Sequence, residues 1–111
     1  MKELKQLKFA EPLPGLIRSG SKTTTWRIDD NKEIARGDIL SLCDASGKEF
    51  LQAKVVKTRE TKFGSLATSD WEGHERFNDE AEMYKTYSRY YNIEVGPETE
   101  LKIIKFKTID D

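Results

Sequence analysis

Two apolar strands joined by a short polar loop, between residues 38 and 58, constrain the fold more than any other part of the sequence. Asp38 to Cys43 is an apolar run, and Phe50 to Thr58 alternates apolar and polar side chains, as a strand with one packed face does. Gly47 lies in the loop at a position that favours a positive φ. We therefore predict a β-hairpin. The side chains expected to face inward in its second strand are Leu51, Ala53 and Val55.

Strand and helix patterns also follow one another along the rest of the chain. Apolar alternation predicts strands from Leu4 to Phe9, from Thr23 to Ile28 and from Glu100 to Ile109. Leu13 to Gly20 predicts one or two helical turns that end at a glycine, and Asp79 to Tyr91 predicts a longer helix. This order favours an α+β fold, a small mixed β-barrel flanked by a short N-terminal helix and a longer late helix. A chain of 111 residues is expected to form one domain over residues 1–111.

Three details of the second half are also predicted. Asp79 is expected to be the N-cap of the late helix. The residues from Asp70 to His74 are expected to form a loop. The inward parity of the last strand changes between Ile103 and Ile104, which predicts a bulge there. The late-helix stripe expected to face the core is Phe77, Ala81, Tyr84, Ser88 and Tyr91.

The segment from Gly20 to Arg27 carries the candidate functional residues. Gly20 can adopt the left-handed conformation that ends a helix, and Lys22 is expected to lie in the turn that follows. Alternation then places Thr25 and Arg27 on one face of the strand and Trp26 on the other, buried face. A hydroxyl and a guanidinium therefore share a surface that is expected to open onto something polar.

Composition limits the kinds of function. The chain has 19 basic and 20 acidic side chains and a formal net charge of −1, so a basic binding surface must be local. The single cysteine, Cys43, lies in an apolar run and is expected to be a core residue. With one histidine, His74, and no paired metal-ligand spacing, neither a metal nor a cofactor is predicted. The sequence contains no apolar run of membrane-spanning length and no signal-peptide pattern, so we expect a cytoplasmic protein without membrane contact.

The motif resembles the signature of a known family. Gly20, Lys22, Thr25 and Arg27 give the pattern G-x-K-x-x-T-x-R, and the pair Gly37-Asp38 follows before the next strand. This combination resembles the ASCH family, whose members are small domains with a PUA-like β-barrel. The resemblance extends to the order of strands and helices over nearly the whole chain, and it implies that fold.

The resemblance implies binding of RNA or a modified nucleoside in a cleft between the motif strand and the late helix. Lys22 as a mobile charge and Arg27 as a planar fork suit a polyanion, and Gly20 and Thr25 complete the expected ligand-binding set. An alternative is enzymatic: the chain is similar to bacterial N4-acetylcytidine amidohydrolases, which implies a catalytic set of Lys22, Thr25 and Glu82. Glu82 is also placed as a helix-capping residue, and both roles stay open. The sequence leaves the oligomeric state open.

Overall fold

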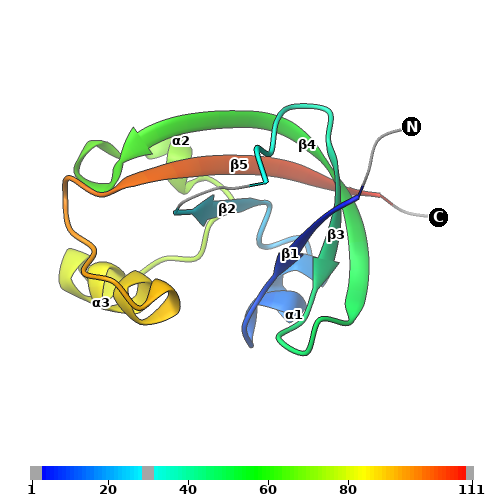
Figure 1. The fold of residues 1–111 in the computed structure, drawn as a ribbon, viewed down its shortest axis with the longest axis horizontal. Coiled ribbons are helices and arrows are strands. Elements are labelled where there is room, and N and C mark those ends of the chain that lie inside the picture. The colour runs from blue at the N-terminus through cyan, green and yellow to red at the C-terminus, as the bar shows by residue number, and fades with distance from the viewer. Residues whose placement is uncertain (1–3, 29–31, 110–111) are drawn as a thin grey trace.

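Five strands form one curled sheet in the residues that the computed structural model describes, 4–28 and 32–109 (Figure 1). The spatial order is β1-β3-β4-β5-β2. β1 and β3 run parallel, and the other three neighbouring pairs are antiparallel. The expected α+β barrel is confirmed as a sheet curled into an open half-barrel. The strands are β1 Lys5–Lys8, β2 Thr24–Arg27, β3 Ile39–Cys43, β4 Glu49–Lys62 and β5 Glu100–Ile109.

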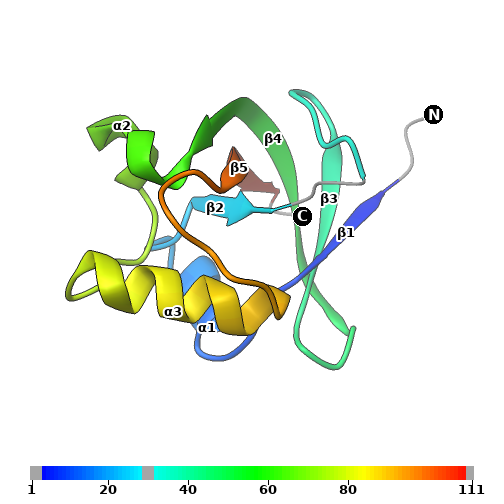
Figure 2. The ribbon, with the colours of Figure 1, turned by 60° about the vertical axis from the view of Figure 1, so that its left-hand side comes forward.

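Helices cover part of this sheet. The expected short helix is α1, Leu13–Arg18, and the expected late helix is α3, Glu80–Tyr91, with Asp79 as its N-cap. A 3-10 turn at Phe63–Ser65 leads to a further short helix, α2, Thr68–Trp71, which overlaps a segment expected to be loop. Figure 2 shows α3 in front of α1, below β2. None of the described helices is long and apolar enough to cross a membrane. The sequence also predicts a polar turn from Asp29 to Glu33, of which residues 29–31 lie outside the described part of the chain.

The sheet carries an apolar core on each face. Ile104 belongs to the core inside the curl, with Leu40 and Val55, whereas Ile103 belongs to a second core with Trp26. Successive residues of a strand face opposite sides, so ordinary alternation buries both isoleucines. The predicted bulge at Ile103 or Ile104 is therefore wrong. The register shift lies in the partner strand β4, between Val55 and Lys57.

The α3 face that packs inward also differs from the prediction. Met83 and Tyr87 are its buried residues, while Tyr84 and Tyr91 are half-buried and Ala81 is exposed. Met83 and Tyr87 belong to the same core as Trp26. Packing against this second core, which helical spacing alone does not reveal, sets the rotation of the helix.

The two edge strands of the half-barrel, β1 and β2, are bridged by a side chain. Arg27 Nη2 donates a hydrogen bond to the carbonyl oxygen of Lys8, 3.0 Å away. The same guanidinium lies over the ring of Phe9, 4.7 Å from its centroid. Arg27 thus links the end of β2 to the chain that leaves β1, beside the opening described next.

Candidate functional site

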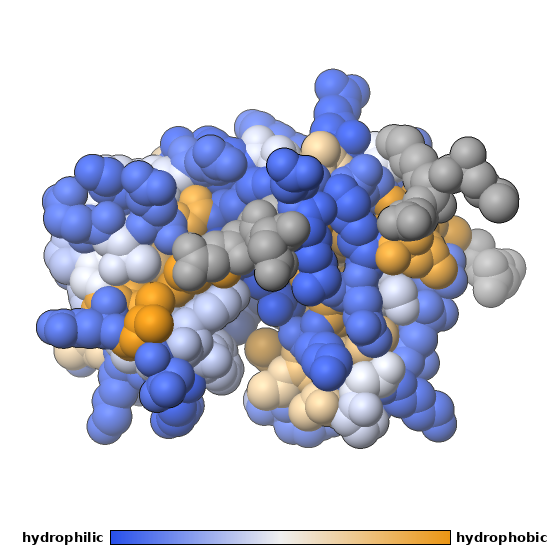
Figure 3. Space-filling view, in the orientation of Figure 1, coloured by the Kyte–Doolittle hydropathy of each residue, from blue (hydrophilic) through white to orange (hydrophobic). Residues whose placement is uncertain are grey.

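A cleft of about 350 Å³ lies between β2, α3 and the segment that follows β1. Phe9 and Leu13 line one side, and three tyrosines of α3 line the other. Figure 3 shows the surface hollowed between these two parts of the molecule. The polar groups that line it are contributed by both halves of the chain. They include Lys22, Thr25, Arg27 and Glu75.

The end of α1 places Lys22 at the cleft. Gly20 has a φ of +86°, as predicted for the residue that ends this helix. The backbone N–H groups of Ser21 and Lys22 both donate to the carbonyl of Leu16, at 3.0 and 3.1 Å. This tight turn holds Lys22 just before β2, which begins at Thr24. The expected position of Lys22 in the turn is confirmed.

Lys22 is buried and paired, not mobile. Only 2% of the residue is exposed. Its Nζ donates to the carbonyl of Thr24 at 2.7 Å and to Glu75 Oε1 at 2.5 Å. Burial lowers the pKa of Lys22, since a desolvated ammonium is unfavourable; Glu75 opposes this shift and Arg27 adds to it. Lys22 is therefore not the mobile charge that the sequence suggested, because its amine is held inside the protein at the wall of the cleft.

Glu75 reaches Lys22 on a loop that is attached to β2. The backbone N–H groups of Thr23 and Thr24 donate to the Gly73 carbonyl at 2.8 and 3.0 Å. The Thr24 hydroxyl donates to the Glu72 carbonyl at 2.6 Å. Gly73 has a φ of +76°, and a Cβ there would lie 2.0 Å from Thr23 Oγ1. Glycine at position 73 therefore permits the loop to lie this close to the strand.

His74 fixes the same loop from the other side. Its ring stacks on Trp26, with centroids 3.8 Å apart. Nδ1 lies 2.8 Å from the Glu75 carbonyl oxygen, and Nε2 lies 3.1 Å from the Tyr87 hydroxyl. Burial, reinforced by the charge of Lys22, lowers the pKa of His74 to about 3, so the ring is neutral at pH 7. A carbonyl only accepts, so Nδ1 carries the proton and Tyr87 donates to Nε2.

The charge state of Glu75 follows from these neighbours. Burial alone would raise the pKa of its carboxyl group, but the charge of the Lys22 ammonium and the hydrogen bond that it donates act in the opposite direction. The net result is a pKa below the ordinary value for glutamate. At neutral pH the carboxylate is therefore ionised and paired with Lys22. Glu75 and His74 are not recognisable as site residues from the sequence, because loop residues far from the motif show no periodic pattern.

Thr25 contributes a hydroxyl to the cleft wall. The residue is 4% exposed and lines the cleft. Among the residues with described positions, none forms a hydrogen bond with this hydroxyl. Trp26 is buried, as predicted, on the opposite face of β2. The Thr25 hydroxyl is therefore available to a bound molecule.

Glu82 lies elsewhere. It is exposed near the start of α3, and its backbone N–H donates to Asp79 Oδ1 at 2.8 Å. Its carboxylate accepts from Asn78 Nδ2 at 2.9 Å. These contacts are those of a residue that stabilises the helix start. The structure does not bring Glu82 to Lys22 and Thr25, and the glutamate in that place is Glu75.

Arg27 lines the cleft and carries a donor that no described residue uses. Its Nε is buried and has no hydrogen-bond partner within the described residues. A buried N–H without a partner is costly, so it favours a ligand that brings an acceptor. Across the cleft, Tyr90 is 47% exposed and lines the opening. The ring of Tyr90 and the donor of Arg27 together suit a flat molecule that carries a hydrogen-bond acceptor.

Cys43 does not line the cleft. Cys43 is free and buried, as predicted for a core residue. In the described residues, no group of three or more histidine, cysteine or acidic side chains is placed to hold a metal ion.

Comparison with known proteins identifies the fold. No family model and no curated protein sequence matches this chain. The crystal structure of an ASCH domain from Lactobacillus crispatus JV V101 matches with a TM-score of 0.69 at 14% identity, over 96% of this chain and 79% of that one. Protein EF3133 from Enterococcus faecalis V583, of family DUF984, matches with a TM-score of 0.75 at 18% identity, over 99% and 82%. Hypothetical protein PH0355 matches with a TM-score of 0.74 at 24% identity, over 96% and 100%. The expected ASCH-type fold is thus confirmed.

Proposed function

Given this ASCH-type fold, we propose that the cleft binds a modified nucleoside and hydrolyses an amide on its base, with N4-acetylcytidine as substrate and cytidine and acetate as products. One observation carries the proposal. The buried pair of Lys22 and Glu75 lines the same cleft as the unpartnered Thr25 hydroxyl. The resemblance to N4-acetylcytidine amidohydrolases implied a lysine, a threonine and a glutamate, and here Glu75 takes the place assigned to Glu82.

The chemistry begins at Thr25. A threonine hydroxyl is a weak nucleophile at neutral pH and needs an adjacent base. Lys22 serves as that base in its neutral form, and the lowered pKa of its amine makes this form more accessible. Glu75, hydrogen-bonded to Nζ, accepts one proton from the Lys22 ammonium and so gives this neutral form. It keeps that proton through the acyl transfer and returns it to Lys22 when the turnover is complete.

The proposed reaction then proceeds in two steps. Thr25 Oγ1 bonds to the acetyl carbon, its proton passes to Lys22, and the bond between that carbon and N4 of the base breaks. The departing amine takes its proton from Lys22 and leaves as cytidine. Water then attacks the acetyl carbon and gives a proton to Lys22. The bond between that carbon and Thr25 Oγ1 breaks, and Lys22 passes the proton to Oγ1, which releases acetate and restores the hydroxyl.

The walls of the cleft account for recognition of a base. Tyrosine rings such as Tyr90 offer stacking surfaces, which is a common way to hold an unpaired base. Arg27 Nε supplies a donor for a carbonyl oxygen of the ligand. Both features also suit a domain that binds a nucleoside or RNA without hydrolysing it, which is the second candidate function.

The test is to incubate the protein with N4-acetylcytidine and to follow cytidine and acetate. The wild type is expected to release both, Thr25→Ser is expected to keep part of this turnover, and Thr25→Val is expected to have none while remaining folded. A pure binder predicts no turnover by any form. In that case Thr25→Val loses only a hydrogen bond to the ligand, about 0.5–1.5 kcal/mol of affinity. Unchanged N4-acetylcytidine after incubation with folded wild-type protein would overturn the hydrolase proposal.

A further inference from the structure

A cluster of four lysines lies on the long β4–β5 ribbon, outside the cleft. Lys54 lies directly opposite Lys107 in the strand register, and Lys57 lies directly opposite Lys105. Three of these side chains are exposed and Lys105 is half-buried. None of them lines the cleft. We call these four residues the lysine strip.

The four side chains lie on one face of the ribbon. Lys105 and Lys107 are two residues apart in a strand without a register shift, so they face the same side. Phe106, between them, points the other way and is buried in the core inside the curl. In β4 the two lysines are three residues apart, but the register shift between Val55 and Lys57 adds one residue to this strand. Lys54 therefore lies opposite Lys107, and Lys57 lies opposite Lys105. The strip therefore occupies the outer face of the sheet.

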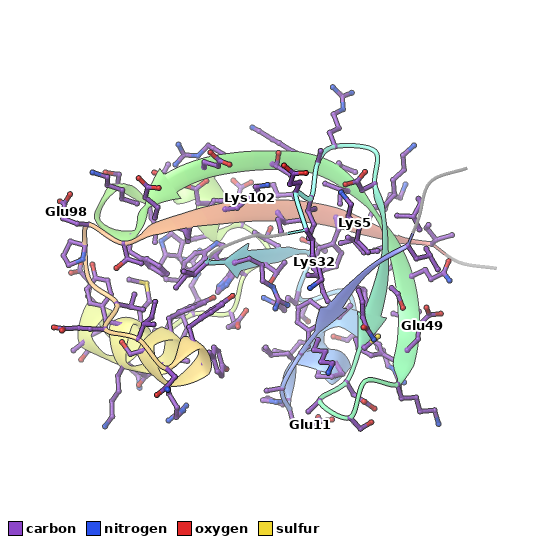
Figure 4. All side chains as sticks on the ribbon, viewed as in Figure 1. Lys5, Glu11, Lys32, Glu49, Glu98 and Lys102 are labelled. Carbon is purple, nitrogen blue, oxygen red and sulfur yellow. The ribbon has the colours of Figure 1, made fainter. Side chains whose placement is uncertain are left out.

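In the described part of the chain, the carboxylate nearest to the strip in its effect is Asp70, whose pKa is lowered by Arg59 first and by the charge of Lys105 in addition, but it forms its ion pair with Arg59. Among the described residues, none of the four lysines forms an ion pair; the only hydrogen bond of these amines joins Lys105 Nζ to the Ser69 carbonyl at 2.6 Å. The neighbouring cation, Arg59, is paired with Asp70. Figure 4 places Glu98 and Glu49 toward opposite ends of the ribbon.

This arrangement is unfavourable for the protein alone. Like charges directly opposite one another across two strands destabilise a sheet, and here two such pairs are adjacent. The chain as a whole has a net charge of −1, so the positive charge on this face is a local concentration. A polyanion bound along the ribbon would be attracted by all four ammonium groups and would reduce the repulsion between them. The release of its counterions would add to the affinity.

We propose that the lysine strip binds the phosphate backbone of single-stranded RNA. The choice of RNA among polyanions rests on the proposed function, since a nucleoside in the cleft can be part of a strand. No aromatic side chain belongs to the strip, so the contact is to phosphates and is independent of base sequence. The substrate class that follows is a modified nucleoside within an RNA chain, held by the outer face of the sheet in addition to the cleft.

The test compares variants with equal changes in charge. Lys54→Gln/Lys107→Gln and Lys57→Gln/Lys105→Gln each remove one opposed pair, and Lys48→Gln/Lys85→Gln removes two exposed lysines elsewhere. Affinity for a single-stranded RNA of about 16 nucleotides is measured over a range of salt concentrations. Each lost phosphate contact lowers the slope of log affinity against log salt by about 0.7 for a single strand. We expect a fall of about 1.4 for each strip variant and no change for the control.

The outcomes separate this inference from the proposed hydrolysis. A slope equal to that of the wild type in both strip variants, or an equal fall in the control, would overturn the inference. Displacement of the RNA by polyglutamate at the same concentration of charge would also overturn it, because the strip would then favour an acidic peptide. Free N4-acetylcytidine is expected to be hydrolysed equally by the strip variants. The two proposals can also fail separately. If the strip variants show the smaller salt slope for RNA affinity but the wild type does not hydrolyse N4-acetylcytidine, the lysine strip is supported and only the hydrolase proposal is overturned.

Discussion

Lys22 and Glu75 are 53 positions apart in the sequence, yet the Nζ of one lies 2.5 Å from Oε1 of the other. The contact joins the turn before β2 to the loop after α2. Lys22 is almost fully buried, so Glu75 is the group that compensates its charge inside the protein. With Thr25, this pair gives the cleft a cation, a carboxylate and a hydroxyl.

The two glutamates allow a matched comparison. We expect Glu75→Gln to lower the turnover of N4-acetylcytidine by about 10² to 10⁴, because a neutral amide cannot exchange a proton with Lys22. Glu82→Gln removes the same charge but lies outside the cleft, and it is expected to leave turnover close to that of the wild type. Both variants are measured by kcat/KM alongside a thermal melt. Equal loss of activity in the two variants would contradict the assignment of Glu75.

The loop that carries Glu75 is predicted to depend on Gly73. Gly73→Ala forces a Cβ against Thr23 Oγ1 at a positive φ, so it is expected to shift the loop and lower both stability and turnover. Gly15→Ala is the control. Its Cβ meets nothing within 4 Å and lies in α1, where alanine favours the helix by up to about 1 kcal/mol. Urea unfolding and kcat measure the difference, and a fully active Gly73→Ala protein would show that the loop tolerates displacement.

His74 is expected to make stability depend on pH. Its pKa is about 3 in the folded protein, against an ordinary value of 6.5, so between these values the unfolded chain binds a proton that the folded protein does not. Stability therefore falls as the pH drops from about 6.5 toward 3, by up to about 1.4 kcal/mol for each unit. His74→Gln removes this contribution. Urea unfolding of both proteins at several pH values gives the difference, in which the shared titration of carboxylates cancels; parallel curves would contradict the prediction.

Trp26 is expected to be a main source of stability. Its ring packs against His74, Trp71 and Phe63, and its Nε1 donates to the Asp70 carbonyl at 3.2 Å. Trp26→Ala is predicted to lower the free energy of unfolding by about 3–5 kcal/mol.

Tyr90→Ala supplies an aromatic control for this measurement. Tyr90 is largely exposed, so the change is expected to alter stability by less than about 1 kcal/mol while weakening ligand binding. Chemical denaturation followed by circular dichroism compares the two variants. A larger loss of stability at Tyr90 than at Trp26 would mean that the cleft wall, and not the tryptophan, supports the second core.

Local features of the fold were predictable because they depend on residues close together in the chain. The left-handed conformation of Gly20 and the positive φ of Gly47 follow from the turns in which these glycines lie. The cap of α3 at Asp79 and the position of Lys22 before β2 follow in the same way. Alternation likewise predicted the burial of Trp26. Successive residues of a strand point to opposite faces, so the polar neighbours Thr25 and Arg27 place Trp26 on the other face.

The partner of Lys22 was decided only by the tertiary structure. Glu82 is the better candidate by position in a helix, and Glu75 lies in a loop with no pattern of its own. Which carboxylate meets the amine depends on the path of that loop, which is set by contacts of Gly73 with β2 and of His74 with Trp26 and Tyr87. The burial of both Ile103 and Ile104 has the same origin, since it needs a separate core on each face of the sheet. A sequence specifies such long-range contacts only through the whole packed fold, so local periodicity does not reveal them.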